Sequence, residues 1–166
     1  MSKIAIIGAT GRAGSQLLEE ALRRGHTVTA IARNTDTLAA RPGLTVKKVD
    51  ALDATALQQA VSGNDVVISA AHFATLPASA VIGPVKKAGV KRLLVVGGAG
   101  SLLLPGGSRV IDSEGFPAEY KAEASAGAEF LDVLRQEKEL DWTFLSPSAE
   151  FVETERTGKF LSLIHI

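Results

Sequence analysis

The chain of 166 residues contains no cysteine, which excludes disulfide bonds, thiolate nucleophiles and cysteine-ligated metals. Aromatic residues are few, and Tyr120 is the only tyrosine. Lysine plus arginine and aspartate plus glutamate both number 18, so no net charge attracts nucleic acid or an anionic membrane surface. No apolar run approaches membrane-spanning length. We therefore expect a soluble cytoplasmic protein without a metal site, which binds neither nucleic acid nor membranes.

Three glycines at a spacing of three, Gly8, Gly11 and Gly14, follow a short apolar run at residues 4–7. The apolar run predicts a buried strand, and the amphipathic pattern after the glycines predicts a helix that ends at Gly25. A β-carbon in such a turn would obstruct a pyrophosphate, and the free N–H groups of the helix N-terminus attract an anion. The stretch therefore predicts a phosphate-binding turn.

Strand and helix patterns alternate along the rest of the chain. Strands are predicted at residues 26–33, 44–49, 65–71, 92–96 and 141–145. Helices are predicted at residues 53–62, 77–88 and 117–138, the last with Phe130, Val133 and Leu134 facing the core. Alternation without a repeat or linker predicts one α/β domain over residues 1–166, a Rossmann-type doubly wound parallel sheet with strand order 3-2-1-4-5-6.

In such a sheet the ligand lies at the carboxyl ends of the strands. Arg33 lies at that end of the second strand, where an acidic residue would select the 2′-hydroxyl of NAD. A guanidinium suits a 2′-phosphate instead, so we predict NADP(H) as the preferred cofactor and NAD(H) as the alternative. A solvated loop arginine is the competing interpretation. His26 lies at the opposite end of that strand and is interpreted as structural, and Asp53 as a helix N-cap.

Five segments form a familiar set: residues 8–14 (GATGRAG), 33–34 (RN), 49–53 (VDALD), 95–101 (VVGGAGS) and 140–147 (LDWTFLSP). The set resembles the atypical short-chain dehydrogenases known as NADH-flavin reductases or NAD(P)H-binding proteins, which are relatives of biliverdin reductase B and of the NmrA-like group. The resemblance extends from residue 3 to about residue 160. It implies an NAD(P)H-dependent reductase that passes a hydride from the nicotinamide to a flavin-like or other conjugated acceptor.

The same resemblance implies roles for individual residues. The pyrophosphate would lie at Gly8, Thr10, Gly11, Arg12 and Gly14. The adenosine ribose or its phosphate would lie at Arg33, and the adenine at Asp50 and Leu52. The second ribose would lie along Ala70 and Ala71, and the nicotinamide near Ser101, Pro147 and Ser148.

The chain departs from the mainstream dehydrogenases, which use a Tyr-x-x-x-Lys pair to pass a proton. The residue four positions after Tyr120 is Ala124, and the adjacent Lys121 would point elsewhere on a helix. Delocalised acceptors take a proton from solvent, so the site need only hold two rings face to face. The catalytic candidates are then Ser101, His72 and Tyr120. A purely structural role fits His72 equally well, and a position on the helix surface without a function fits Tyr120 equally well.

The main alternative function is a non-catalytic NmrA-like redox sensor that binds the dinucleotide and signals to a partner, because the missing tyrosine pair fits it equally. A nucleotide-sugar epimerase shares the glycine turn, but it usually needs the tyrosine pair and a larger substrate domain. We interpret the apolar end at residues 161–166 as a truncated or non-native tail. We expect a monomer or weak homodimer whose partner is a small-molecule acceptor.

Overall fold

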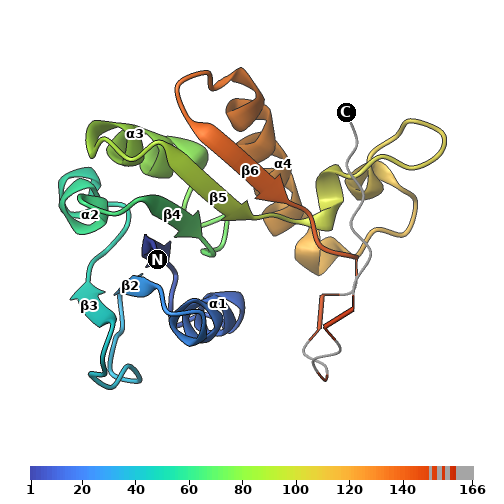
Figure 1. The fold of residues 1–166 in the computed structure, drawn as a ribbon. Helices are drawn as coiled ribbons and strands as arrows, with labels where there is room; N and C mark the ends of the chain where they lie inside the picture. Colours follow the sequence, from blue (N-terminus) through green and yellow to red (C-terminus); the bar gives the residue numbers. More distant parts are fainter. Residues whose placement is uncertain (150, 153–154, 156–157, 160–166) are drawn as a thin grey trace.

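The computed structural model describes residues 1–149, 151–152, 155 and 158–159, so the predicted tail at 161–166 lies outside the described residues. Its strands are β1 (Lys3–Ile7), β2 (Thr27–Ala32), β3 (Leu44–Lys48), β4 (Val66–Ser69), β5 (Arg92–Val96) and β6 (Asp141–Leu145). They form one parallel sheet in the order β3-β2-β1-β4-β5-β6 (Figure 1). The predicted fold class and strand order are confirmed.

Helices cover both faces of the sheet. In the described part of the chain they are α1 (Arg12–Arg23), α2 (Ala54–Val61), α3 (Ala78–Lys87) and α4 (Ala118–Gln136). Helix α1 packs its buried Leu18 and Ala21 against one face, beside Ile6 and Val28. The other three helices share the larger core cluster on the opposite face. The chain leaves β1 toward β2 and β3 and then adds β4, β5 and β6 on the other side of β1, a change of direction that places helices on both faces because such crossovers prefer one hand. Since all strands are parallel, their carboxyl ends lie at one edge.

Local sequence signals explain where the helices begin and end. Asp53 precedes α2, and its Oδ1 accepts hydrogen bonds from the backbone N–H groups of Thr55 and Ala56, both at 3.0 Å. This confirms the predicted N-cap. Gly25 follows α1 in the left-handed region with a φ of 79°, a conformation that glycine adopts without steric cost.

Several predicted element boundaries differ from the structure by one or two residues, and one predicted core residue is misplaced. Strand β4 ends at Ser69 rather than at residue 71, although the Ala70 N–H still donates to the Ile7 carbonyl at 2.9 Å. The prediction that Val133 faces the core is wrong, because its side chain is 46% exposed. Phe130 and Leu134 lie four residues apart and share the buried helix face, and Val133 is turned about 100° away from Leu134.

Aromatic residues join three elements beside the carboxyl edge of the sheet. The Phe73 ring lies 5.2 Å from Phe130 in an edge-to-face arrangement and 5.8 Å from Phe144 in a stacked one. Trp142 of β6 pairs with Leu93 of β5 and packs, partly buried, against the larger core cluster. The loop after β4, α4 and β6 are thereby held together. None of the helices in the described ranges is long and apolar enough to cross a membrane.

Candidate functional site

The three glycines after β1 build a turn that has no room for side chains. Gly8 has a φ of 78°, and a β-carbon on it would lie 2.9 Å from the Ala70 carbonyl oxygen. A β-carbon on Gly14 would lie 2.1 Å from the Gly8 carbonyl oxygen, and one on Gly11 would lie 3.2 Å from the same atom. The backbone therefore approaches itself and the end of β4 as closely as glycine permits.

This turn opens directly into α1, whose N-cap is Gly11. No acidic side chain occupies the first turn of the helix. The first N–H groups of a helix lack intrahelical partners and carry partial positive charge. A tight glycine turn that leads into such a helix can hold the two phosphates of a dinucleotide against backbone N–H groups.

Backbone hydrogen bonds gather the strand ends around this turn. The N–H of Gly8 donates to the Ile31 carbonyl at 2.9 Å, beside Arg33, and the N–H of Val49 donates to the Ala32 carbonyl at 3.0 Å, beside Asp50. On the other side, Gly97 after β5 donates to the last residue of β6 at 2.9 Å. The residues predicted to bind the cofactor accordingly follow the carboxyl ends of adjacent strands.

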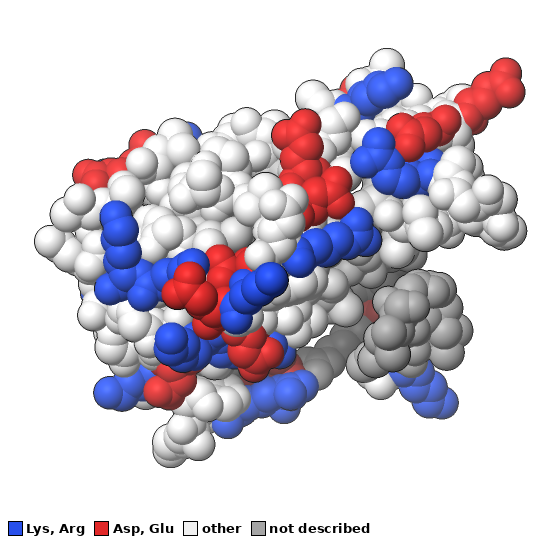
Figure 2. Space-filling model, turned by 90° about the horizontal axis from the view of Figure 1, so that it is seen from above, with Lys and Arg blue, Asp and Glu red and all other residues white. Residues whose placement is uncertain are grey.

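Arg12 and Arg33 differ from the other arginines in the described ranges, because neither guanidinium has a hydrogen bond or ion pair there. The remaining described arginines each bond an acidic side chain; they are Arg23, Arg24, Arg41, Arg92, Arg109 and Arg135. In Figure 2 basic and acidic side chains accordingly lie next to one another over the face in view. Both exceptions are exposed and lie beside the glycine turn, where they are available to an anionic ligand.

At the end of β4, His72 and α4 are joined by one carboxylate. Glu123 of α4 accepts hydrogen bonds from the backbone N–H groups of Phe73 at 2.7 Å and Ala74 at 2.9 Å. Its Oε1 also lies 3.4 Å from Nδ1 of His72, whose side chain is 85% exposed. The loop after β4 is therefore fixed to α4, and the imidazole stands at the open edge of the sheet.

Ser101 lies at the end of a single 3-10 turn, Ala99–Ser101, after β5. Its side chain is half-buried and makes no hydrogen bond within the described residues. The turn touches α4, because a β-carbon on Gly100 would lie 2.9 Å from the Ala124 β-carbon. The turn and the helix at Ala124 therefore pack closely enough that a side chain at position 100 would have no room.

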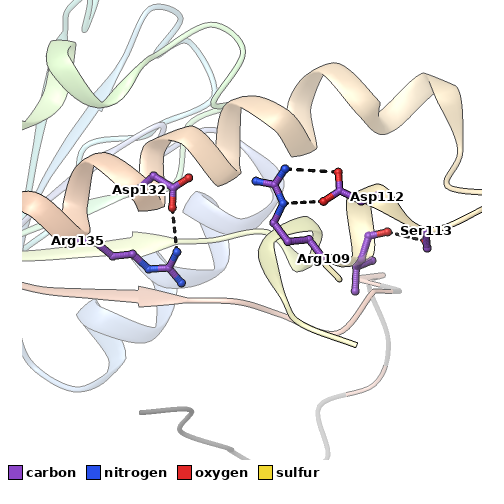
Figure 3. Close-up of polar contacts among 6 residues, drawn as sticks. Arg109, Asp112, Ser113, Asp132 and Arg135 are labelled. Carbon is purple, nitrogen blue, oxygen red and sulfur yellow. Dashed lines mark hydrogen bonds and ion pairs between the residues drawn. The ribbon is translucent and has the colours of Figure 1, made fainter. Parts of the chain in front are cut away.

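The loop from residue 102 to 117 contains an internal ion pair. Arg109 Nε donates to Asp112 Oδ2 at 2.8 Å, and its Nη2 donates to Oδ1 at 3.4 Å (Figure 3). Arg109 thereby holds the pKa of the Asp112 carboxyl below its ordinary value. Ser113 Oγ donates to the Val110 carbonyl at 2.6 Å. These contacts give the loop a defined course between β5 and α4.

The remaining predicted residues lie more openly. The Asp50 carboxylate accepts the Leu52 N–H at 3.0 Å and so closes a local turn after β3; Leu52 is 57% exposed. Ala70, Ala71 and Pro147 are half-buried, and Thr10 and Ser148 are exposed. Tyr120 is 63% exposed in the first turn of α4. Across the described ranges no hydrogen bond or ion pair joins Ser101, His72 and Tyr120 to one another, and no group of side chains could hold a metal ion.

Glu123 is the residue of this edge that sequence reasoning missed. It stands among alanines and charged residues in a helix with a mixed pattern, where a glutamate is ordinarily a solvated surface residue. Its two backbone partners lie 50 and 49 positions away in sequence. Only the packing of α4 against the end of β4 reveals the contact, and no local signal predicts it.

A doubly wound parallel sheet with a glycine turn at the start of its first helix defines a dinucleotide-binding protein of the Rossmann class. The model of the family described as NAD(P)H-binding matches residues 8–162. The chain therefore belongs to that NAD(P)H-binding family, as the sequence segments predicted.

Similar proteins support the same assignment. YwnB of Bacillus subtilis, an uncharacterised protein, is 40% identical over 168 residues, which cover 95% of this chain and 78% of YwnB. A solved structure from Bacteroides thetaiotaomicron, provisionally named an epimerase, is 41% identical with a TM-score of 0.89 and covers 95% of this chain and 76% of its own. A solved structure from Streptococcus pneumoniae, provisionally named an NADH-flavin reductase, is 36% identical with a TM-score of 0.80. The match covers 95% of this chain and 78% of the Streptococcus pneumoniae chain.

Proposed function

We propose that the protein is an NAD(P)H-dependent reductase that transfers a hydride to a flavin-like or other conjugated acceptor. The observation that carries the proposal is the pairing of the glycine turn with two arginines, Arg12 and Arg33, that have no acidic partner in the described ranges. The provisional name of the Streptococcus pneumoniae relative supports the choice of a flavin-like acceptor.

The residues present fit a dinucleotide. A β-carbon at Gly8 or Gly14 would collide with the chain's own backbone. Such contacts belong to the tight turn and the close helix–strand packing of a dinucleotide-binding glycine turn. In this proposal the phosphates lie against the N-terminus of α1, with Thr10 and Arg12 beside them. Arg33 takes the 2′-phosphate, so NADP(H) is preferred over NAD(H). Asp50 and Leu52 border the adenine, and Ala70 and Ala71 border the second ribose.

On the other half of the edge, Ser101, Pro147 and Ser148 surround the nicotinamide. When bound, the reduced nicotinamide supplies the hydride. The Ser101 hydroxyl, without a partner of its own in the described residues, hydrogen-bonds the carboxamide or the acceptor. His72 contributes a ring nitrogen, and Tyr120 forms a wall of the acceptor site. The proton follows from solvent, since this edge offers no tyrosine–lysine pair to pass it.

Nucleotide binding and turnover test the proposal separately. The protein is titrated with NADPH and with NADH while nicotinamide fluorescence is followed, and riboflavin or FMN is then added while the absorbance of the reduced nicotinamide is recorded. We expect tighter binding of NADPH and steady oxidation only when flavin is present. Binding without oxidation would contradict the reductase and favour the redox sensor, whereas the absence of binding would contradict the interpretation of the glycine turn.

The same proposal includes a cytoplasmic monomer or weak homodimer that acts on a small molecule. The lack of cysteine fits a reducing compartment. Light scattering on the purified full chain, at concentrations that bracket the micromolar range, tests the oligomeric part. A stable tetramer or larger assembly would contradict it.

A further inference from the structure

Glu123 has the most connected carboxylate of the candidate site, because each oxygen accepts one backbone N–H of the loop after β4. Oε1 bonds Phe73 at 2.7 Å and Oε2 bonds Ala74 at 2.9 Å. The same Oε1 lies 3.4 Å from Nδ1 of His72. Hydrogen bonds to an ionised carboxylate are stronger than bonds between neutral groups, so this carboxylate fixes the loop after β4. It also stands within ion-pair distance of the exposed ring at the start of that loop.

The helix that carries Glu123 has little freedom to shift. A β-carbon on Gly127, one turn further along α4, would lie 3.0 Å from the Phe73 ring, and Ala124 touches the turn at Gly100. Phe73 also packs edge-to-face on Phe130 of the same helix. Small residues on this face of α4 thus allow its backbone to pack closely against the loop after β4 and the turn after β5. This packing fixes the position of Glu123 along the helix beside His72.

A carboxylate can only accept a hydrogen bond. Beside Oε1, the Nδ1 atom of His72 must therefore carry its proton if the two atoms are to attract one another, and the neutral imidazole is left with a bare Nε2. That nitrogen is then an acceptor rather than a donor. The ligand group that it suits is an N–H, such as the amide of a carboxamide or a ring N–H of the acceptor, and not a carbonyl oxygen.

We propose that Glu123 is a positioning residue which fixes His72 as its Nδ1–H tautomer, so that Nε2 accepts a hydrogen bond from an N–H group of the bound ligand. The role of the ligand rests on the proposed function, whereas the tautomer is a property of the free protein. Glu123 itself touches neither cofactor nor acceptor in this proposal. It acts through His72 and through the course of the loop.

The test is nitrogen-15 NMR of the histidine side chains in the nucleotide-free protein at neutral pH, with H72Q to assign the signal. We expect the Nδ1–H tautomer for His72, a shift of the population toward Nε2–H in E123Q, and amide exchange at Phe73 and Ala74 that is faster by roughly tenfold. E129Q is the matched control, because it makes the same change at an exposed position of α4, and it should alter neither signal.

A wild-type spectrum with His72 as the Nε2–H tautomer would overturn the proposal without any variant, so a poorly folded E123Q does not leave it undecided. An unchanged tautomer in a folded E123Q would overturn it as well. In the ligand-bound state, E123Q and H72Q should weaken binding of the reduced nucleotide or raise the KM of the acceptor, each by roughly tenfold. Absence of turnover in the wild type would count against the reductase alone, because the tautomer is measured without nucleotide.

Discussion

The carbonyl oxygen of Gly8 lies 2.1 Å from the point that a β-carbon on Gly14 would occupy. No rotamer change can relieve such a contact, because both groups are backbone. We expect G14A to displace the glycine turn, to weaken nucleotide binding at least tenfold and to lower the free energy of unfolding by about 1–3 kcal/mol. Titration with NADPH and urea unfolding measure the two effects.

Gly83 offers the matched control, since it is also a helical glycine but has nothing within 4 Å of its β-carbon position. G83A in α3 should keep nucleotide binding and raise the free energy of unfolding by about 0.5–1 kcal/mol, because alanine loses less backbone entropy in a helix. Equal behaviour of the two variants would contradict the role given to the turn.

Arg33 is predicted to distinguish the two nicotinamide cofactors. If its guanidinium bonds the 2′-phosphate, R33A should weaken NADPH binding by roughly tenfold or more and leave NADH binding nearly unchanged. R12A is the comparison, because an arginine at the pyrophosphate contacts both cofactors and its loss should weaken both alike. Equal losses for NADPH and NADH in R33A, measured by fluorescence titration, would refute the NADP preference.

Ala124 is predicted to be intolerant of the lysine found in the mainstream dehydrogenases. It faces Gly100 so closely that a β-carbon added there would lie 2.9 Å from the Ala124 β-carbon, so we expect a lysine side chain at position 124 to crowd the turn. We expect A124K to lower the free energy of unfolding by about 1–3 kcal/mol and to confer no alcohol oxidation. A122K, at an exposed position of the same helix, should be stable. A stable A124K would show that the contact is looser than described.

The contacts of Glu137 lead us to expect that the free energy of unfolding falls in acid. The backbone N–H of Glu139, followed by the Lys86 ammonium, lowers the pKa of the Glu137 carboxyl below its ordinary value of 4.5. A group whose pKa is lower in the folded state stabilises the fold above its unfolded pKa and ceases to do so as the pH falls through the folded value. Its contribution is therefore complete at neutral pH and is lost below about 4.5.

Urea unfolding of wild type and E137Q over a pH series measures this loss. The wild type should be the more stable of the two at pH 7, and the difference should shrink as the pH falls below about 4.5. E129Q serves as the exposed control and should follow the wild type throughout. A difference that is independent of pH would mean that Glu137 acts by packing rather than by charge.

The fold was predictable because short apolar runs and glycines divide the chain at nearly every strand end. Gly25 and Asp53 set helix boundaries through local backbone chemistry, which a sequence displays directly. The core position predicted for Val133 was wrong because the mixed apolar pattern of α4 does not indicate which face of the helix packs against the sheet. That face is set by packing partners such as Phe73, which contacts Phe130 of α4 and lies far away in sequence.

In the candidate site too, features formed by neighbouring residues were predictable, whereas contacts between distant segments were not. The glycine turn is a local pattern that the sequence displays, and in the structure its positions have no room for a side chain. The carboxylate of Glu123 and the contact between Ala124 and Gly100 arise only when α4 docks beside β4 and β5. The functional roles of Ser101, His72, Tyr120 and the cofactor-binding residues stay predictions.

The single tryptophan of the chain gives the protein a built-in optical reporter. Trp142 lies on β6, shortly before Pro147 and Ser148, which border the proposed nicotinamide position. Emission of a partly buried indole overlaps the absorption band of a reduced nicotinamide but not that of an oxidised one. Energy transfer from this one ring would therefore report the binding of reduced nucleotide and its loss on oxidation, without any label attached to the protein.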